Sequence, residues 1–156
     1  MTKHPASIMM LGVVGSDGKA MPPVFFQEGY RLTSEDYIKV LKKEYACKRV
    51  CFQLDGAPAH TAKNTQKWLK ENVEFWPKDF WPSSPPDLNP LDFSIWAHIE
   101  RQACKKRHNS TKALKPSITK AWAKMDPTYI KNTCSTFRPR VVAVMEAKGQ
   151  IVKNIL

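Results

Sequence analysis

Residues 49–62 read RVCFQLDGAPAHTA. Its first six residues are largely apolar, which predicts a buried strand over residues 49–54. Asp55 and Gly56 then end the strand. Functional groups collect at the carboxyl ends of strands in open α/β sheets. Asp55 is therefore a candidate functional residue.

A second stretch, residues 81–96, reads WPSSPPDLNPLDFSIW. Its prolines fix φ and remove N–H donors, which predicts a stiff, irregular loop. Asn89 followed by Pro90 marks a helix start, with Asn at the N-cap and Pro at the first helical position. Asp92 then falls in the first turn of a helix whose start the loop fixes.

Each carboxylate also has an ordinary explanation. An Asp at a strand end often caps the turn, and an Asp in a first helical turn favours the helix dipole and completes a capping box. Taken together with His60, Asp55 and Asp92 indicate a divalent-metal site. Hard oxygen ligands suit Mg²⁺ or Mn²⁺, and such sites act on phosphodiesters.

The rest of the chain predicts an α/β fold, in the order β-β-α-β-α-β followed by helices. The expected strands are 7–15, 24–26, 49–54 and 73–76, and the expected helices are 34–45, 61–72, 90–106 and two beyond Thr111. Thr33 or Ser34 caps the first helix, and Asp17-Gly18 makes the hairpin turn. The inward stripes are Tyr37, Ile38, Leu41 and Tyr45; Trp68 and Leu69; Leu91, Ile95, His98 and Ile99; Leu114, Ile118, Ala121 and Trp122; and Val141, Val144 and Met145, with Gly149 as a helix stop.

The charge is unevenly distributed over the 156 residues. The formal net charge is +11, yet residues 1–100 hold 12 basic and 12 acidic side chains, and residues 101–156 hold 13 basic and 2 acidic ones. A basic segment beside a neutral one suggests a polyanion such as nucleic acid. The alternative is a solvated helical surface.

Candidate phosphate-binding side chains follow from this segment. Such binding is independent of base sequence and weakens steeply with salt. The candidates are Lys105, Lys106, Arg107, Lys112, Arg138 and Arg140, with Lys115, Lys120, Lys124 and Lys131 scattered among them.

Other protein classes fit poorly. With 42% apolar residues the chain is too apolar for a disordered protein, yet it has no run long enough for a membrane helix and no secretion signal. The four cysteines are therefore expected to be free thiols. Cys47 and Cys51 are spaced for metal, but no second pair follows, which disfavours structural zinc.

The two stretches resemble the second and third carboxylate motifs of mariner-type DNA transposases. The first runs from Gln53 to Ala62 and the second from Trp81 to Trp96, and 36 residues separate Asp55 from Asp92, close to the spacing in that superfamily. The helical end, including Trp122 and residues 140–150, is also similar. The resemblance covers nearly the whole chain.

This resemblance implies a ribonuclease H-like mixed sheet flanked by helices, in which three carboxylates bind two Mg²⁺ or Mn²⁺ ions. Asp55 would be the second carboxylate and Asp92 the third. His60 matches the motif histidine and would orient Asp55 or bond the backbone, and Asn89 is a further candidate behind the ligands. The resemblance also implies that the partner is DNA, at the transposon ends and at the target, and it allows a homodimer. No association with a membrane is expected, and in a eukaryote the expected location is the nucleus.

The first carboxylate has no match before Asp55, because in the family it lies upstream of the hairpin. Asp17 is a poor substitute, since it lies in a turn that the family also has. The family's first strand, central in the sheet, is also expected to be missing, which leaves strand edges unpaired. A site with two carboxylates should bind metal weakly, so we expect this chain alone not to cleave DNA.

We therefore interpret residues 1–156 as one truncated transposase catalytic domain. Residues 1–100 would form the sheet and metal-site part, and residues 101–156 the basic helical part. The alternative is a domesticated or decayed remnant that binds nucleic acid or protein without catalysis.

Overall fold

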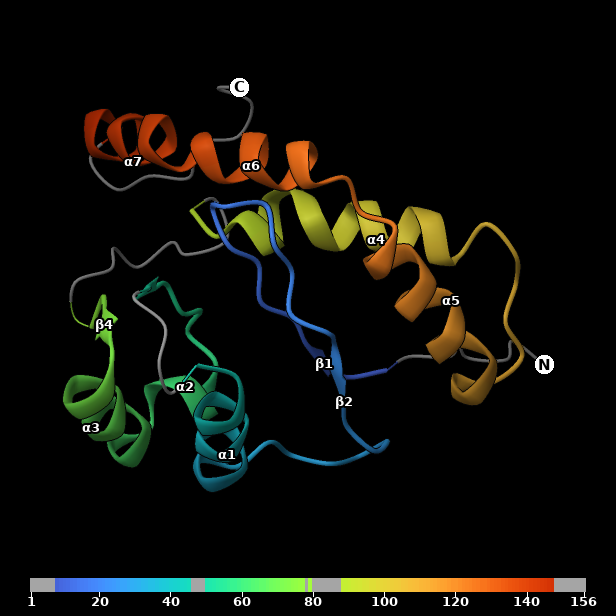
Figure 1. The fold of residues 1–156 in the computed structure, drawn as a ribbon, viewed down its shortest axis with the longest axis horizontal. Coiled ribbons are helices and arrows are strands. Elements are labelled where there is room, and N and C mark those ends of the chain that lie inside the picture. Colours follow the sequence, from blue (N-terminus) through green and yellow to red (C-terminus); the bar gives the residue numbers. More distant parts are fainter. Residues whose placement is uncertain (1–7, 46–49, 78, 80–87, 148–156) are drawn as a thin grey trace. The chain divides into compact units, whose positions relative to one another are not determined.

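The computed structural model describes residues 8–45, 50–77, 79 and 88–147. It divides into two compact units (Figure 1). The first unit comprises Met1–Tyr30 and Pro90–Pro139, and the second comprises Arg31–Asn89 and Arg140–Leu156. Across the described residues, no helix is both long enough and apolar enough to cross a membrane.

The first unit begins with the predicted hairpin. Strands β1 (Met10–Leu11) and β2 (Val24–Phe25) pair antiparallel, with Met10 opposite Phe25. Towards the turn, the pairing continues only as an isolated bridge between Val14 and Ala20. Gly18 closes the turn with φ of 86°, a conformation that glycine adopts without a Cβ clash. The strands are therefore shorter than predicted, because the ladder is interrupted on its way to the turn.

Helices complete the first unit: η2 (Leu91–Ile95), α4 (Trp96–Ala103), α5 (Thr111–Ala123) and α6 (Pro127–Ser135). Their apolar faces form one core with the hairpin, as the predicted stripes require. The buried members are Ile95, Ile99, Ala103, Leu114, Ile118, Trp122, Met125 and Ile130. The predicted helix over 90–106 ends earlier, at Ala103.

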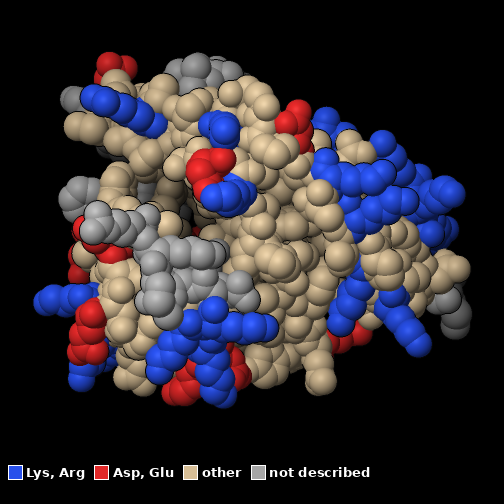
Figure 2. Space-filling view, in the orientation of Figure 1, with Lys and Arg blue, Asp and Glu red and all other residues tan. Residues whose placement is uncertain are grey.

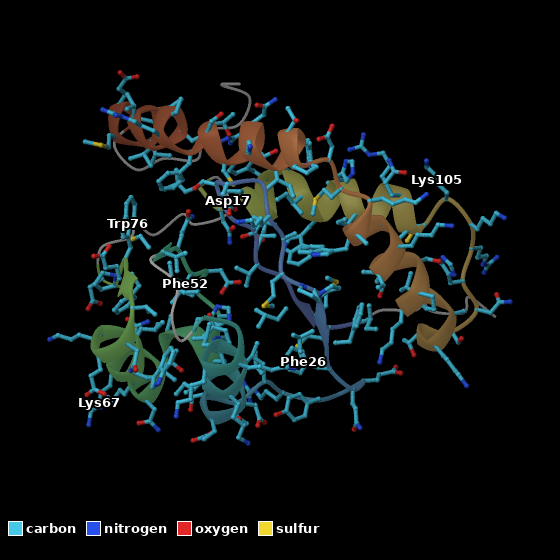
Figure 3. The ribbon with its side chains drawn as sticks, in the orientation of Figure 1. Asp17, Phe26, Phe52, Lys67, Trp76 and Lys105 are labelled. Atoms are coloured by element: carbon cyan, nitrogen blue, oxygen red, sulfur yellow. The ribbon has the colours of Figure 1, made fainter. Side chains whose placement is uncertain are left out.

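The second unit holds α1 (Ser34–Tyr45), β3 (Cys51–Phe52), α2 (Pro58–Thr61), α3 (Lys63–Asn72) and β4 (Glu74–Phe75). Strands β3 and β4 pair parallel, with Phe52 opposite Phe75. The N–H of Trp76 donates to the Phe52 carbonyl at 3.0 Å and extends the pairing by one bond (both side chains are labelled in Figure 3). The element order β-β-α-β-α-β is confirmed.

Two details of the helices differ from the predictions. The helix expected from residue 61 begins at Pro58, which suits a first helical position, and it breaks at Ala62, whose ψ of 142° is extended. In α7 (Phe137–Glu146), Met145 is 72% exposed, so its place in an inward stripe was wrong. The buried residues of α7 are Ala143 and Val144. They lie three and four positions after Arg140 and therefore on the same face of the helix as Arg140. The predicted stop at Gly149 lies outside the described residues.

Candidate functional site

Asp55 lies three residues beyond β3, at its carboxyl end. Its side chain is 41% exposed. Its Oδ1 accepts a hydrogen bond from the backbone N–H of Ala57 at 3.0 Å and lies 2.5 Å from Nδ1 of His60. Because an ionised carboxylate can only accept, the imidazole is the donor. Within the described residues both bonds fall on Oδ1, so Oδ2 suits a hard cation.

These contacts keep the Asp55 carboxyl ionised. Partial burial on its own would raise the pKa. The hydrogen bond from His60, the attraction of the imidazole and the bond from Ala57 outweigh burial and lower the pKa below the ordinary value. An ionised oxygen that is still partly exposed is the form that binds a divalent ion.

His60 is buried, with 7% of its surface exposed. It lies in the single turn of α2, and its own carbonyl accepts a hydrogen bond from Nε2 of Gln66 at 2.8 Å. The aromatic ring of Tyr37, from α1, packs on the imidazole with ring centroids 4.2 Å apart. Of the two roles considered for His60, the geometry matches the one that orients Asp55.

Asp92 is exposed and lies in η2 of the first unit. The helix starts as the Asn89-Pro90 pair predicts, but its first turn is a π-helix in which the Trp96 N–H donates to the Leu91 carbonyl. Such turns occur frequently at functional sites. Asp55 belongs to the second unit.

The segment that leads to Asp92 is fixed in the second unit by a side chain that sequence reasoning missed. Nε2 of Gln53 donates to the Leu88 carbonyl at 2.9 Å. Leu88 and Asn89 are buried, at 1% and 9% exposure. Gln53 is within the first motif and Leu88 within the second, yet their spacing alone gave no signal that they bond.

Other metal-binding arrangements find no support in the described residues. They contain no group of three or more His, Cys, Asp or Glu side chains that could hold a metal. Cys51 is an exposed free thiol, and Cys47 lies outside the described residues. Asp17, labelled in Figure 3, lies in the hairpin turn. It pairs with Lys19 at 2.9 Å, and bonds from the Lys19 side chain and backbone lower its pKa. Asp17 therefore stabilises the turn.

The candidate phosphate-binding residues lie mostly on the surface. Figure 2 shows Lys and Arg gathered over the part of the first unit where α4 and α5 lie. Lys105, Lys106 and Arg107 follow α4, and Lys112 lies in the first turn of α5; all four are exposed. Arg138 in α7 is exposed, whereas Arg140 is half-buried.

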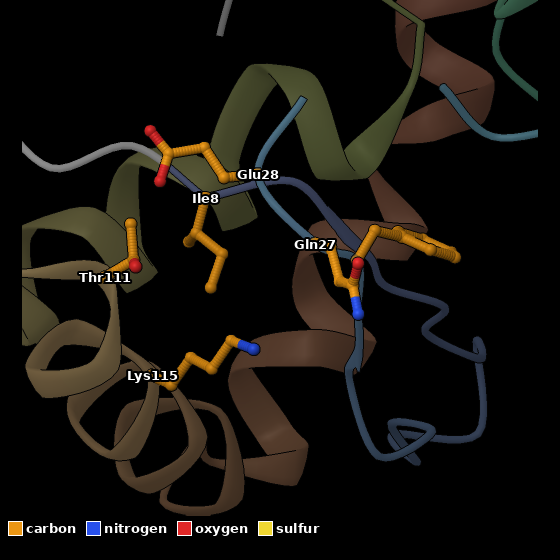
Figure 4. Close-up of a pocket in the computed structure, with 6 residues that line it drawn as sticks. Ile8, Gln27, Glu28, Thr111 and Lys115 are labelled. Atoms are coloured by element: carbon orange, nitrogen blue, oxygen red, sulfur yellow. The ribbon is translucent and has the colours of Figure 1, made fainter. Parts of the chain in front are cut away.

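The first unit holds a small pocket whose lining includes neither carboxylate (Figure 4). It is lined by Ile8, Phe26, Gln27, Glu28, Thr111 and Lys115 and holds about 40 Å³. That volume suits a few water molecules and not a nucleotide. Lys115 also lies over the Phe25 ring, 5.6 Å from its centroid, which is a cation–π contact.

Comparison with known proteins identifies the family of this chain. The sequence profile of the DDE superfamily endonuclease family matches residues 1–115. The chain belongs to this family. The resemblance to mariner-type transposases, seen first in the two carboxylate motifs, is thereby confirmed.

Two curated relatives of this DDE superfamily endonuclease chain come from nematodes. The Tcb2 transposase of Caenorhabditis briggsae is 27% identical over 124 residues, which cover 76% of this chain and 44% of the relative. The Tc3 transposase of Caenorhabditis elegans is 26% identical over 129 residues, covering 76% of this chain and 38% of the relative. The chain thus spans less than half the length of these relatives.

Solved structures show the fold. The catalytic domain of the Mos1 mariner transposase superposes with a TM-score of 0.78 at 19% identity, over 98% of this chain and 79% of that one. The same domain solved with raltegravir and Mn gives 0.78 over 95% of this chain and 78% of that one. The α/β, ribonuclease H-like fold class is therefore confirmed.

Proposed function

We propose that this chain is part of the catalytic region of a DNA transposase that cleaves phosphodiester bonds and joins transposon DNA with divalent metal ions. The observation that carries this proposal is the Asp55 carboxylate, at the end of β3, with Oδ1 held by His60 and Ala57 and an exposed fraction of 41%. The membership of the DDE superfamily endonucleases supports it.

In this proposal Asp55 and Asp92 bind the metal, Mg²⁺ or Mn²⁺. Bound ions of this kind activate a water or a DNA 3′-hydroxyl and stabilise the leaving oxygen. Asp55 would bind through Oδ2, since His60 and Ala57 occupy Oδ1. Gln53 would steady the segment that leads to the helix of Asp92 through its bond to Leu88, and the next residue, Asn89, is also buried. Two structures of the Mos1 domain, one with Mn and one with Mg, support this choice of metals.

DNA is the proposed partner. One solved relative is a Mos1 paired-end complex with a left transposon end, and its fold matches this chain with a TM-score of 0.79. The exposed side chains Lys105, Lys106, Arg107, Lys112 and Arg138 would follow the phosphate backbone. Arg140, being half-buried, would contribute less. A homodimer and a nuclear location remain predictions of the resemblance.

We also propose that Asp55 and Asp92 lack a third catalytic carboxylate among the described residues. Asp17 pairs with Lys19 in a turn and does not fit the role. The chain alone should therefore bind metal weakly and leave plasmid DNA intact. Metal-dependent nicking by the purified chain, abolished by Asp55→Ala, would contradict this.

The experiment that tests the metal site is a titration of the whole chain with Mn²⁺, in which the relaxation rate of water protons reports binding. Asp55→Asn and Asp92→Asn should each weaken binding by about tenfold or more, because each removes a charged ligand. The matched controls are Glu71→Gln and Glu100→Gln, which neutralise exposed carboxylates in the same two units. Equal affinities in all four variants would refute the proposed site, and DNA binding without metal binding would favour a non-catalytic remnant.

A further inference from the structure

Tyr37 is buried beside the candidate metal ligand although neither carboxylate motif contains it. It lies in the first turn of α1, and 2% of its surface is exposed. The turn is set by Thr33, whose Oγ1 accepts the Asp36 N–H at 3.2 Å and whose carbonyl accepts the Tyr37 N–H at 3.1 Å. The Tyr37 ring lies against His60, inclined at 33° with centroids 4.2 Å apart.

We infer that Tyr37 is a positioning residue that acts on Asp55 through His60. This inference rests on the proposed function, in which Asp55 binds a metal ion. The rotation of an imidazole about its Cβ–Cγ bond is broad, and only some ring orientations direct Nδ1 at Oδ1 of Asp55. A buried aromatic ring against the imidazole face restricts that rotation.

The backbone of His60 is restrained separately. Its carbonyl accepts the bond from Gln66, and the neighbouring Ala59 carbonyl accepts one from Thr65 Oγ1 at 2.7 Å. With the backbone restrained from α3, the ring orientation is a further freedom, and Tyr37 is a contact that limits it. Hydrogen-bonded partners that orient ligands in this way raise metal affinity.

The test compares three variants of the full chain in the Mn²⁺ titration. The free energy of unfolding of each variant is measured separately by urea denaturation. Tyr37→Leu removes the ring and should weaken Mn²⁺ binding about fivefold to tenfold. Tyr37→Phe keeps the ring and should retain affinity within about twofold. Leu41→Ala is the matched control: Leu41 is 1% exposed and lies one turn further along α1, so its loss lowers stability while the Tyr37 ring is kept. If Tyr37→Leu does not fold, Tyr37→Met replaces it.

A double-mutant cycle shows whether Tyr37 acts through His60. In a His60→Leu background, Tyr37→Leu should cause no further loss of affinity, because the hydrogen bond that it supports is already gone. An undiminished loss in that background, or a loss in Leu41→Ala equal to that in Tyr37→Leu, would overturn the positioning role. A parent chain whose Mn²⁺ binding is unaffected by Asp55→Asn would instead overturn the proposed function, and the role of Tyr37 with it.

Discussion

Asp55 is held by two neighbours in its own segment. Ala57 and His60 both bond to Oδ1, and both favour the ionised carboxylate over the neutral acid. The same contacts fix the direction in which Oδ2 faces. One residue thereby combines a defined charge with a defined orientation, which a metal ligand requires.

The lowered pKa of Asp55 predicts an acid dependence of stability. A carboxyl whose pKa is lower in the folded chain than its usual 3.8 stabilises the fold above that pH, and the contribution is lost as the pH falls through the folded value. The difference in unfolding free energy between the parent chain and Asp55→Asn should therefore shrink below about pH 4. Urea unfolding at several pH values measures it. A difference that grows towards acid would contradict the assignment.

Gly12 allows a close approach of two tryptophans in the first unit. A Cβ at this position would lie 2.5 Å from Cη2 of Trp122 and 2.8 Å from Cη2 of Trp96. The Trp122 indole cannot easily move away, because its Nε1–H donates to the Met21 carbonyl at 2.7 Å. Gly12→Ala should lower the unfolding free energy by about 1–3 kcal/mol. In Gly56→Ala, where nothing lies within 4 Å, the change should be much smaller; equal effects would contradict the packing argument.

At the residue scale, the sequence predicted the candidate site residues but not the side chains that hold them in place. Asp55 could be found because it directly follows an apolar strand, and His60 because a resemblance placed it in the motif. Tyr37 was expected in the core, correctly, but helical spacing identifies a buried face and not what it packs against. Gln53 and Leu88 are 35 positions apart, and a bond over that distance depends on the tertiary fold.

At the scale of elements, the order was predictable and the bounds of α1 were too, but several other boundaries were not. The hairpin strand expected over 7–15 is regular only at Met10–Leu11, because strand length depends on partners that a pattern cannot show. The π-turn at Leu91–Ile95 follows from shifted backbone hydrogen bonding, as in the bond from the Trp96 N–H to the Leu91 carbonyl, and leaves no periodic signal. In α7 the predicted stripe of Val141, Val144 and Met145 was only partly right, because the buried residues are Ala143 and Val144.

Gln53 gives a test at this scale, because its side chain joins the end of β3 to the segment before η2. Gln53→Met keeps the length of the side chain and removes the donor, leaving the carbonyl of the buried Leu88 without this bond. The unfolding free energy should fall by about 1 kcal/mol or more. Asn72→Leu is the control, since it removes an exposed amide bond to the Trp68 carbonyl within one helix. An equal loss in both variants would contradict a special role for Gln53.

For the whole molecule, charge and family support the same interpretation. The net charge of +11 comes from residues 101–156, and the family match ends at residue 115. Beyond that point the similarity to Mos1 catalytic domains rests on the fold, which covers up to 98% of the chain. Composition alone suggested only a polyanion partner, and the carboxylate motifs were needed to propose transposon DNA.

DNA affinity should depend on where the positive charges lie. Replacing Lys105, Lys106, Arg107 and Lys112 with Gln should weaken binding to any duplex and reduce the salt slope by about 0.9 for each phosphate that is no longer neutralised. The matched control replaces the exposed Lys42, Lys43, Lys67 and Lys70 of the second unit, which removes the same charge. Fluorescence anisotropy at several salt concentrations distinguishes the two sets. Equal slopes would contradict a DNA-binding surface at α4 and α5.

We propose that Asp55 and Asp92 both bind the divalent ion, and paramagnetic broadening by Mn²⁺ tests this proposal most directly. In ¹H–¹⁵N spectra of the whole chain, we predict that the amide signals of Gly56, Ala57 and Phe93 broaden together at the same low Mn²⁺ concentration. Asp55→Asn should abolish the broadening at Phe93 as well as at Gly56. Broadening beside one carboxylate only, or broadening at Phe93 that survives in Asp55→Asn, would contradict a shared metal site.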